Sequence, residues 1–210
     1  MKQNNLNSMI KISLLSVMAF ALMFMDMAVP IFPSFLKIDL SDIPALLGAF
    51  ALGPAAGIGI ELFKNILILI FKGTQTGFVG EAANFIVGAL LVGTAGTIYK
   101  ANKSKKTAII GLIAGTVVMS VVASALNYTV LLPLYAKVYK MPVDAFVAMG
   151  TAINPAIKDM KDFILWSILP FNLLKGIVVS AITIPVYKRI SPVLHKEDVV
   201  GDSKKGALEN

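Results

Sequence analysis

The sequence predicts an all-α integral membrane protein of six transmembrane helices with both termini in the cytoplasm. Its composition and the placement of its lysines are the observations behind this fold class. Of 210 residues, 57% are hydrophobic and only 15% are charged, and the mean hydropathy is +0.79. A water-soluble chain of this length could not bury so much apolar area, whereas lipid tolerates an apolar protein surface. We therefore expect a single membrane domain over residues 1–190, followed by a disordered polar cytoplasmic tail over residues 191–210.

The first two apolar runs predict three helices. The run from residue 10 to residue 29 ends at Pro30 and Pro33. It is too long for the apolar core of a signal peptide, and no small-x-small cleavage site precedes the prolines, so we expect a retained first helix. The run from residue 43 to residue 71 would be about 43 Å long as one helix, which exceeds the roughly 30 Å hydrocarbon core. Gly53-Pro54 interrupts this run and predicts a short second helix and a longer third one.

Three further apolar runs predict the remaining spans, over residues 78–99, 107–132 and 163–187. A long connection over residues 133–161 separates the last two. It contains a short apolar stretch, residues 143–153, that is too brief to cross a bilayer.

Positive charge fixes the number of crossings. Lysines gather near the N-terminus, directly after the apolar run of residues 78–99 and directly after the last run. The positive-inside rule places all three groups on the cytoplasmic side, which requires an even number of crossings between them. Counting the break at Gly53-Pro54 as a turn satisfies the rule with four and then six crossings, whereas ignoring it leaves three and five. The predicted outer connections are then residues 30–42, 72–77 and 133–161.

The composition also excludes several functional classes. The chain has no cysteine, and its single histidine, His195, lies in the polar tail, so disulfides, thiolate metal sites and histidine-based sites within the membrane are excluded. The net charge of +7 is attributed to cytoplasmic lysines and not to nucleic-acid binding. No phosphate-binding loop, His-Glu-x-x-His or Gly-x-Ser-x-Gly motif is present. We therefore expect neither ATP hydrolysis by this chain nor an enzyme activity, and no cofactor.

Polar side chains inside the predicted spans mark either a site or a contact between helices, because they are costly in lipid. Glu61, Lys64 and Asn65 share one face of the third helix. We interpret Glu61 and Lys64 as a locally neutral structural pair, with coupling to a partner subunit as the alternative. Other polar residues on three helices fall in the outer half or near the midplane, a bias that scattered helix contacts would not show. These residues are Glu81, Asn84, Asn127, Asn172 and Lys175.

This convergence predicts a polar cavity that opens outward and is covered by the first loop and by the 133–161 connection. Asparagine amides donate and accept hydrogen bonds together, which suits a neutral heterocycle. The only arginine, Arg189, lies on the cytoplasmic side, so a strongly anionic ligand is not expected. Tyr128, Trp166 and Phe171 lie near the same level and are candidate stacking partners.

Five segments carry a family resemblance: residues 35–46 (FLKIDLSDIPAL), 48–54 (GAFALGP), 61–65 (ELFKN), 80–86 (GEAANFI) and 170–176 (PFNLLKG). They resemble the substrate-capture S components of energy-coupling factor (ECF) vitamin transporters, and most of all the riboflavin-specific members. The resemblance extends over roughly residues 14–187. One departure concerns the first helix, where many members carry an Ala-x-x-x-Ala pattern for docking the coupling protein. Here the small residues have another spacing: Ser13, Ser16, Ala19 and Ala21.

The resemblance implies a six-helix protein of the cell membrane that binds riboflavin at its outer face. It also implies association with a transmembrane coupling protein and two ATPase subunits that drive import. Carried onto this sequence, the implied ligand contacts are Lys37, Ile38, Asp39, Leu40, Glu81, Asn84, Asn172 and Lys175. Asn127 is added by the cavity argument above.

Two other functions remain open at the level of the sequence. A stand-alone secondary carrier for a small neutral heterocyclic solute would need a charged relay through the membrane, and only Glu61, Lys64 and Lys175 are candidates for it. A membrane-embedded enzyme ranks third, because no catalytic motif supports it.

Overall fold

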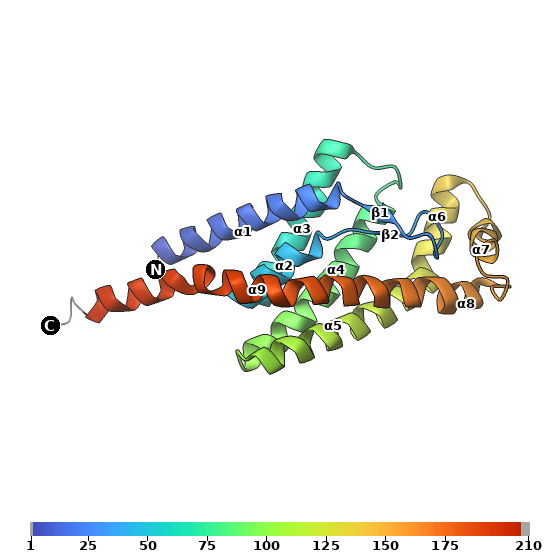
Figure 1. Cartoon of the computed structure of the whole chain (residues 1–210). Coiled ribbons are helices and arrows are strands. Elements are labelled where there is room, and N and C mark those ends of the chain that lie inside the picture. Colours follow the sequence, from blue (N-terminus) through green and yellow to red (C-terminus); the bar gives the residue numbers. More distant parts are fainter. Residues whose placement is uncertain (1, 207–210) are drawn as a thin grey trace.

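The computed structural model describes residues 2–206, and the side-chain surroundings of residues 6–189. It is an elongated helical bundle (Figure 1). The helices, with π-helical segments labelled η, are α1 (Lys2–Met23), α2 (Asp42–Leu52), α3 (Pro54–Lys72), α4 (Val79–Ala101), α5 (Lys105–Leu126), η1 (Asn127–Leu131), α6 (Leu132–Tyr139), α7 (Val143–Thr151), α8 (Met160–Phe163), η2 (Ile164–Ile168) and α9 (Leu169–Gly206). The two strands are β1 (Met27–Ala28) and β2 (Lys37–Ile38).

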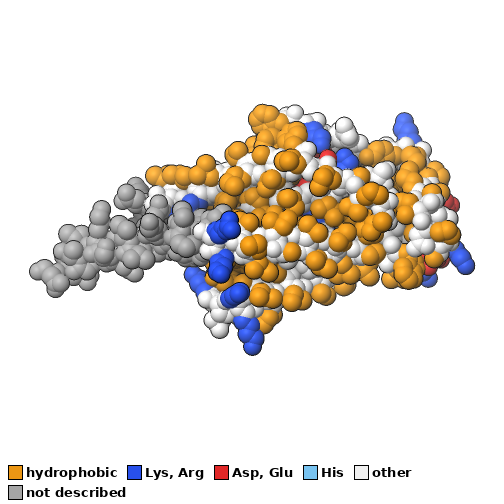
Figure 2. Space-filling view, viewed as in Figure 1, with side chains coloured by type: hydrophobic (Ala, Val, Ile, Leu, Met, Phe, Trp, Pro, Cys, Tyr) orange, Lys and Arg blue, Asp and Glu red, His pale blue; other side chains and the backbone are white. Residues whose placement is uncertain are grey.

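The bundle has two distinct ends. The start of α1, the connection between α4 and α5 and the last turns of α9 lie at one end, called here the terminal end (Figure 1). The β1–β2 hairpin, α6 and α7 lie at the other, called the hairpin end. In the space-filling view, hydrophobic side chains cover the flank between the two ends, and most of the basic side chains lie toward the ends (Figure 2). This surface is the one that a membrane protein presents to lipid.

Five helical stretches among the described residues are long and apolar enough to cross a membrane: Leu6–Met23, Pro54–Lys72, Val79–Ala101, Lys105–Tyr139 and Met160–Arg189. The expected second helix, α2, has only 11 residues, nine of them buried. At 1.5 Å per residue it is about 16 Å long, roughly half the thickness of a hydrocarbon core. Because α2 is short and mostly buried, it lies inside the bundle and not at the lipid-facing surface.

The predicted break at Gly53-Pro54 is confirmed as the turn between α2 and α3. Gly53 has a φ of +104°, a conformation that residues with a Cβ rarely adopt, and Pro54 begins α3. Proline suits a first helical position because its missing N–H would have no partner there.

The first predicted helix ends earlier than expected. The expectation was a helix through residue 29, but α1 ends at Met23, and Met27–Ala28 pairs as an antiparallel strand with Lys37–Ile38. Pro30 and Pro33 push the residues that precede them toward extended backbone, which favours the hairpin over another helical turn.

The later helices are longer than predicted. The run expected to end at residue 132 continues as α5, η1 and α6 to Tyr139, and the predicted long connection contains most of α6 and all of α7. Both π-helical segments lie directly before a proline-containing turn, at Pro133 and Pro170. Proline lacks the N–H that would bond the carbonyl four residues earlier, so a wider turn at these points has a local cause.

Close contact between α4 and α5 depends on two glycines one turn apart. A Cβ at Gly111 would lie 2.8 Å from the carbonyl oxygen of Ala95, and a Cβ at Gly115 would lie 2.7 Å from that of Leu91. Small residues at this spacing allow two backbones to touch, which is how membrane helices gain packing energy without a hydrophobic driving force. This contact holds the two helices whose connection forms part of the terminal end.

The side chains of the expected tail, residues 191–210, lie outside the described residues. Its disorder and its cytoplasmic location stay predictions.

Candidate ligand-binding site

A cavity of about 520 Å³ lies at the hairpin end. Each of the three predicted outer connections contributes to its wall: Phe35 and Lys37 from the first, Gly73 and Thr76 from the second, and Tyr139 from the third. Small-molecule sites have volumes of roughly 300–1,000 Å³. The sequence predicted that these three connections lie on one side of the protein, and all three border this cavity.

Four aromatic side chains form one side of the cavity: Phe35, Tyr135, Tyr139 and Phe146. The rings of Phe35 and Phe146 meet edge to face at 5.8 Å between centroids, and those of Tyr135 and Tyr139 stack at 6.2 Å. Such a wall offers both flat faces and edges to a planar ring. The sequence analysis missed these residues, although Tyr135 and Tyr139 are spaced four apart, as expected for neighbours on one helical face.

The polar groups of the cavity include four of the predicted site residues: Lys37, Asp39, Glu81 and Asn84. Glu81 is held in place by the connection between α3 and α4, since its Oε2 accepts hydrogen bonds from the hydroxyls of Thr74 at 3.1 Å and Thr76 at 2.9 Å. The other carboxylate oxygen of Glu81 has no partner among the described residues.

Charge is nearly balanced around this cavity. Its charged side chains are three carboxylates and two ammonium groups: Asp26, Asp39, Glu81, Lys37 and Lys72. Lys37 and Asp26 form an ion pair at 3.1 Å near the surface. A cavity with a formal charge of only −1 and no guanidinium group suits a neutral polar ligand better than a strongly anionic one.

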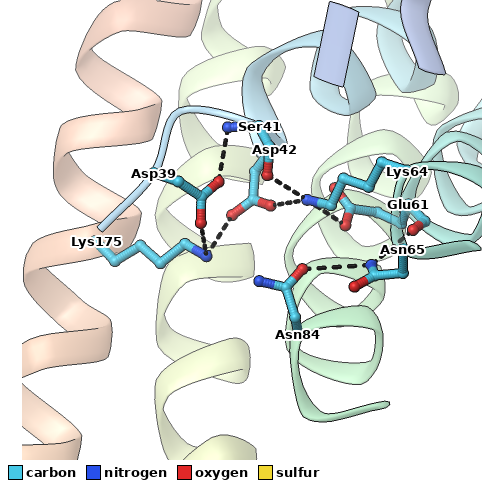
Figure 3. Close-up of polar contacts among 8 residues, drawn as sticks. All are labelled: Asp39, Ser41, Asp42, Glu61, Lys64, Asn65, Asn84 and Lys175. Atoms are coloured by element: carbon cyan, nitrogen blue, oxygen red, sulfur yellow. Dashed lines mark hydrogen bonds and ion pairs between the residues drawn. The ribbon is translucent and has the colours of Figure 1, made fainter. Parts of the chain in front are cut away.

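A buried network of charged groups lies next to the cavity (Figure 3). Its centre is Lys64 of α3, whose ammonium group contacts Oε2 of Glu61 at 2.7 Å and donates to Oγ of Ser41 at 2.7 Å and to Oδ1 of Asp42 at 2.5 Å. Lys64, Glu61 and Asp42 are fully buried. The predicted pair of Glu61 and Lys64 is therefore present, but it is part of a larger group that includes the start of α2.

The network continues to α9 and α4. Lys175 of α9 lies 3.1 Å from Oδ2 of Asp42 and 3.6 Å from Oδ2 of Asp39, so Asp42 stands between the two lysines (Figure 3). On the other side, the amide of Asn65 donates to Oδ1 of Asn84 at 3.3 Å. The network thus joins the first loop, α2, α3, α4 and α9, and two of its members, Asp39 and Asn84, line the cavity.

The charges of the innermost groups cancel. Two carboxylates, on Asp42 and Glu61, face two ammonium groups, on Lys64 and Lys175. Buried charges persist only where partners compensate their lost hydration. Asp39 adds a fifth charged group at the cavity wall, where its Oδ1 also accepts the backbone N–H of Ser41 at 2.9 Å.

The remaining predicted site residues lie away from the cavity lining. Ile38 packs with Phe32 and Phe171, and Leu40 packs against the main hydrophobic core. Lys175 does not line the cavity itself, but its ammonium group lies 3.6 Å from Oδ2 of Asp39, which does.

The two remaining predicted asparagines bond to their own helices. The Nδ2 atoms of Asn127 and Asn172 donate at 2.8 Å to the carbonyl oxygens of Ala123 and Ile168, four residues earlier. Both asparagines lie at or just after a π-helical segment, a feature that often accompanies functional sites.

The three candidate stacking partners from the sequence do not line the cavity. Tyr128 and Trp166 are exposed, and Phe171 is buried against Phe32 at 5.5 Å between ring centroids. The rings that do line it come from the first loop, α6 and α7, whose approach depends on the tertiary fold.

The family model described as ECF transporter, substrate-specific component, matches residues 7–187. The chain is 41% identical to the riboflavin transporter RibU of Staphylococcus aureus, over 93% of this chain and 95% of that protein. It is 34% identical to the riboflavin transporter FmnP of Bacillus subtilis, over 90% and 94%. A solved structure of the S component of a bacterial ECF transporter superposes with a TM-score of 0.71 at 40% identity, covering 90% of this chain and 98% of that one.

Proposed function

This chain belongs to the family of ECF transporter substrate-specific components, and from that premise we propose that it is the riboflavin-binding membrane subunit of a vitamin uptake transporter. The observation that carries the proposal is the aromatic-walled, nearly charge-balanced cavity at the hairpin end. Two relatives that span almost the whole chain are named riboflavin transporters, which supports riboflavin as the ligand. Capture of a ligand requires no chemistry on it, so the proposed role is binding and not catalysis.

The proposed orientation places the hairpin end outside the cell and the terminal end in the cytoplasm. Lysines near the start of α1, between α4 and α5 and at the end of α9 support this orientation through the positive-inside rule. In this arrangement the chain crosses the membrane six times. The short α2 and the extended segment that leads into it from β2 make the second crossing inside the bundle, and both termini lie in the cytoplasm.

Riboflavin would occupy the cavity with its planar ring against the aromatic wall. Lys37, Asp39, Glu81 and Asn84 would then meet its polar edge and its hydroxylated chain directly. Asn127, Asn172, Lys175 and the backbone around Ile38 and Leu40 complete the proposed set of contacts. Of these, Lys175 contacts Asp39 at the cavity wall, so a ligand that displaces Asp39 would reach the ammonium group of Lys175.

ATP-driven import would require partner subunits. The chain carries no phosphate-binding loop of its own, and its family is defined by the substrate-specific component of an ECF transporter. We therefore propose that it associates with a transmembrane coupling protein and two cytoplasmic ATPases. The exposed apolar side of α1, which includes Leu14, Val17 and Met18, is one surface available to such a partner within the membrane.

Purification provides the direct test of ligand identity. The detergent-solubilised protein is expected to be yellow and to release a flavin on denaturation, because stacking against the aromatic wall would retain a planar ligand. After removal of that flavin, added riboflavin should lose fluorescence in proportion to the protein. Colourless protein that leaves riboflavin fluorescence unchanged would contradict the proposal.

Two asparagines test the position of the ligand. Asn84→Ala and Asn172→Ala are each expected to weaken riboflavin binding by at least about 1 kcal/mol, because each removes a hydrogen-bonding amide from the proposed contacts. Fluorescence titration measures the change in Kd. Asn102→Ala, at the terminal end, is the matched control and should bind as the unaltered protein does. Unaltered affinity in both test variants would place the ligand elsewhere.

A further inference from the structure

A second cavity, of about 600 Å³, lies at the terminal end between the α4–α5 connection and α9. Its interior is apolar. Phe50, Tyr99 and Leu112 are buried at its base, and Ile109 and Ile184 are half-buried beside them. Nothing in the proposed capture of a ligand at the hairpin end uses this cavity.

The base of this cavity carries a pair of hydroxyl groups. The rings of Phe50, Tyr99 and Tyr187 pack against one another at 4.8 to 5.8 Å between centroids. The hydroxyls of Tyr99 and Tyr187 lie 2.9 Å apart, and these are their only hydrogen-bond partners among the described residues. One hydroxyl donates to the other, so the second retains a proton for an external acceptor.

Three lysines surround the opening: Lys103, Lys105 and Lys188. All three are exposed, none has an ion-pair partner in the part of the chain that the structure describes, and no acidic side chain lines the cavity. Figure 2 shows basic side chains gathered toward this end of the molecule, next to the hydrophobic flank. An uncompensated cationic rim above an apolar interior is complementary to a molecule with an anionic head and an apolar tail.

We propose that this cavity is a binding site for one anionic phospholipid. The phosphate group lies among Lys103, Lys105 and Lys188, a tyrosine hydroxyl donates to a phosphate or ester oxygen, and an acyl chain enters the space above Phe50 and Leu112. A soluble anion would use only the rim and leave the interior empty, whereas an uncharged lipid would leave three ammonium groups without a partner. The anionic lipid uses both features.

The assignment of this lipid to the cytoplasmic leaflet rests on the proposed orientation, but binding itself depends only on the cavity and its lysines. The site would anchor the α4–α5 connection and the end of α9 at a fixed depth. Riboflavin binding at the other end is a separate property, so either proposal can fail without the other.

Native mass spectrometry of the delipidated protein in a neutral detergent tests the site. The protein should bind one molecule of phosphatidylglycerol at low lipid concentration. It should bind phosphatidylcholine with the same acyl chains much more weakly. Lys103→Gln combined with Lys105→Gln is expected to raise the Kd for phosphatidylglycerol roughly 25-fold, at about fivefold per lysine. The matched control combines Lys100→Gln with Lys106→Gln, which removes the same charge from the same connection outside the cavity. It should change the Kd less than about threefold.

A second variant tests the apolar interior. Ala108→Phe fills the cavity without changing its charge and should also abolish tight binding, while far-UV circular dichroism confirms an intact helical fold. Equal losses in the two lysine double variants would overturn the proposal, because they would indicate general surface charge. Equal affinity for the two phospholipids would overturn it as well. Full competition by soluble glycerol phosphate would have the same consequence, because the headgroup alone would then account for binding.

Discussion

Replacing Lys64 by methionine is expected to lower the free energy of unfolding by about 3–5 kcal/mol, the range found when one partner of a buried ion pair is removed. The ammonium group of Lys64 is the shared partner of Asp42, Glu61 and Ser41, and all of these groups are shielded from solvent. Without it, three buried carboxylates, on Asp39, Asp42 and Glu61, would remain with the single ammonium group of Lys175. Unfolding by sodium dodecyl sulfate in mixed micelles, followed by far-UV circular dichroism, measures the change.

A second substitution tests whether charge balance is the cause. Lys64→Met combined with Glu61→Gln removes one charge of each sign and leaves Asp42 paired with Lys175. It should recover most of the lost stability. Lys106→Met, an exposed lysine at the terminal end, is the control and should change the unfolding free energy by less than about 0.5 kcal/mol. If the double variant is no more stable than Lys64→Met alone, packing and not charge explains the loss.

Gly57→Ala is expected to destabilise the protein by about 1–3 kcal/mol, because overpacking a tight contact shifts backbones. A Cβ at Gly57 would lie 2.4 Å from Cγ1 of Val92, 2.7 Å from Cβ of Ala49 and 2.8 Å from the carbonyl oxygen of Ala45. Two of these atoms belong to the backbone or to an alanine and cannot rotate away. The added methyl group therefore separates α3 from α2, and α2 carries Asp42.

Gly59→Ala is the matched control on the same helix. No heavy atom lies within 4 Å of a Cβ at this position, so alanine should leave stability unchanged or raise it by about 0.5–1 kcal/mol through its better helix propensity. The same micelle unfolding measurement applies to both variants. Equal stability of Gly57→Ala and Gly59→Ala would show that α2, α3 and α4 pack less closely than the structure indicates.

The predictions from sequence succeeded where the signal is local. A glycine followed by proline interrupts an apolar run whatever surrounds it, and the turn at Gly53-Pro54 followed from that alone. The lysine groups identified the terminal end because charged side chains avoid lipid at every position. The helix ends were less accurate, since the hairpin at Met27–Ala28 forms only through pairing with Lys37–Ile38.

The candidate site was predictable only in part. Lys37, Asp39, Glu81 and Asn84 are among the residues singled out in the sequence and they line the cavity, and their contact with a ligand stays a prediction. The aromatic wall was not foreseen, because Phe35, Tyr139 and Phe146 belong to segments that meet only after the chain folds. Their residue types are also common at membrane interfaces, which conceals the signal in a single sequence.

The polar residues of the third helix show the same difference between what local sequence determines and what the tertiary fold determines. The sequence by itself determined that Glu61 and Lys64 share a helical face, because a spacing of three is set by helix geometry. Only the tertiary structure decided that Lys64 also meets Asp42, 22 residues away, and that Lys175 completes the set from the last helix. Apolar runs and charge placement determine which segments enter the membrane, since each segment exchanges water for lipid largely on its own. Which buried charges neutralise one another depends on the distances between helices, and those distances arise from the packing of the whole chain.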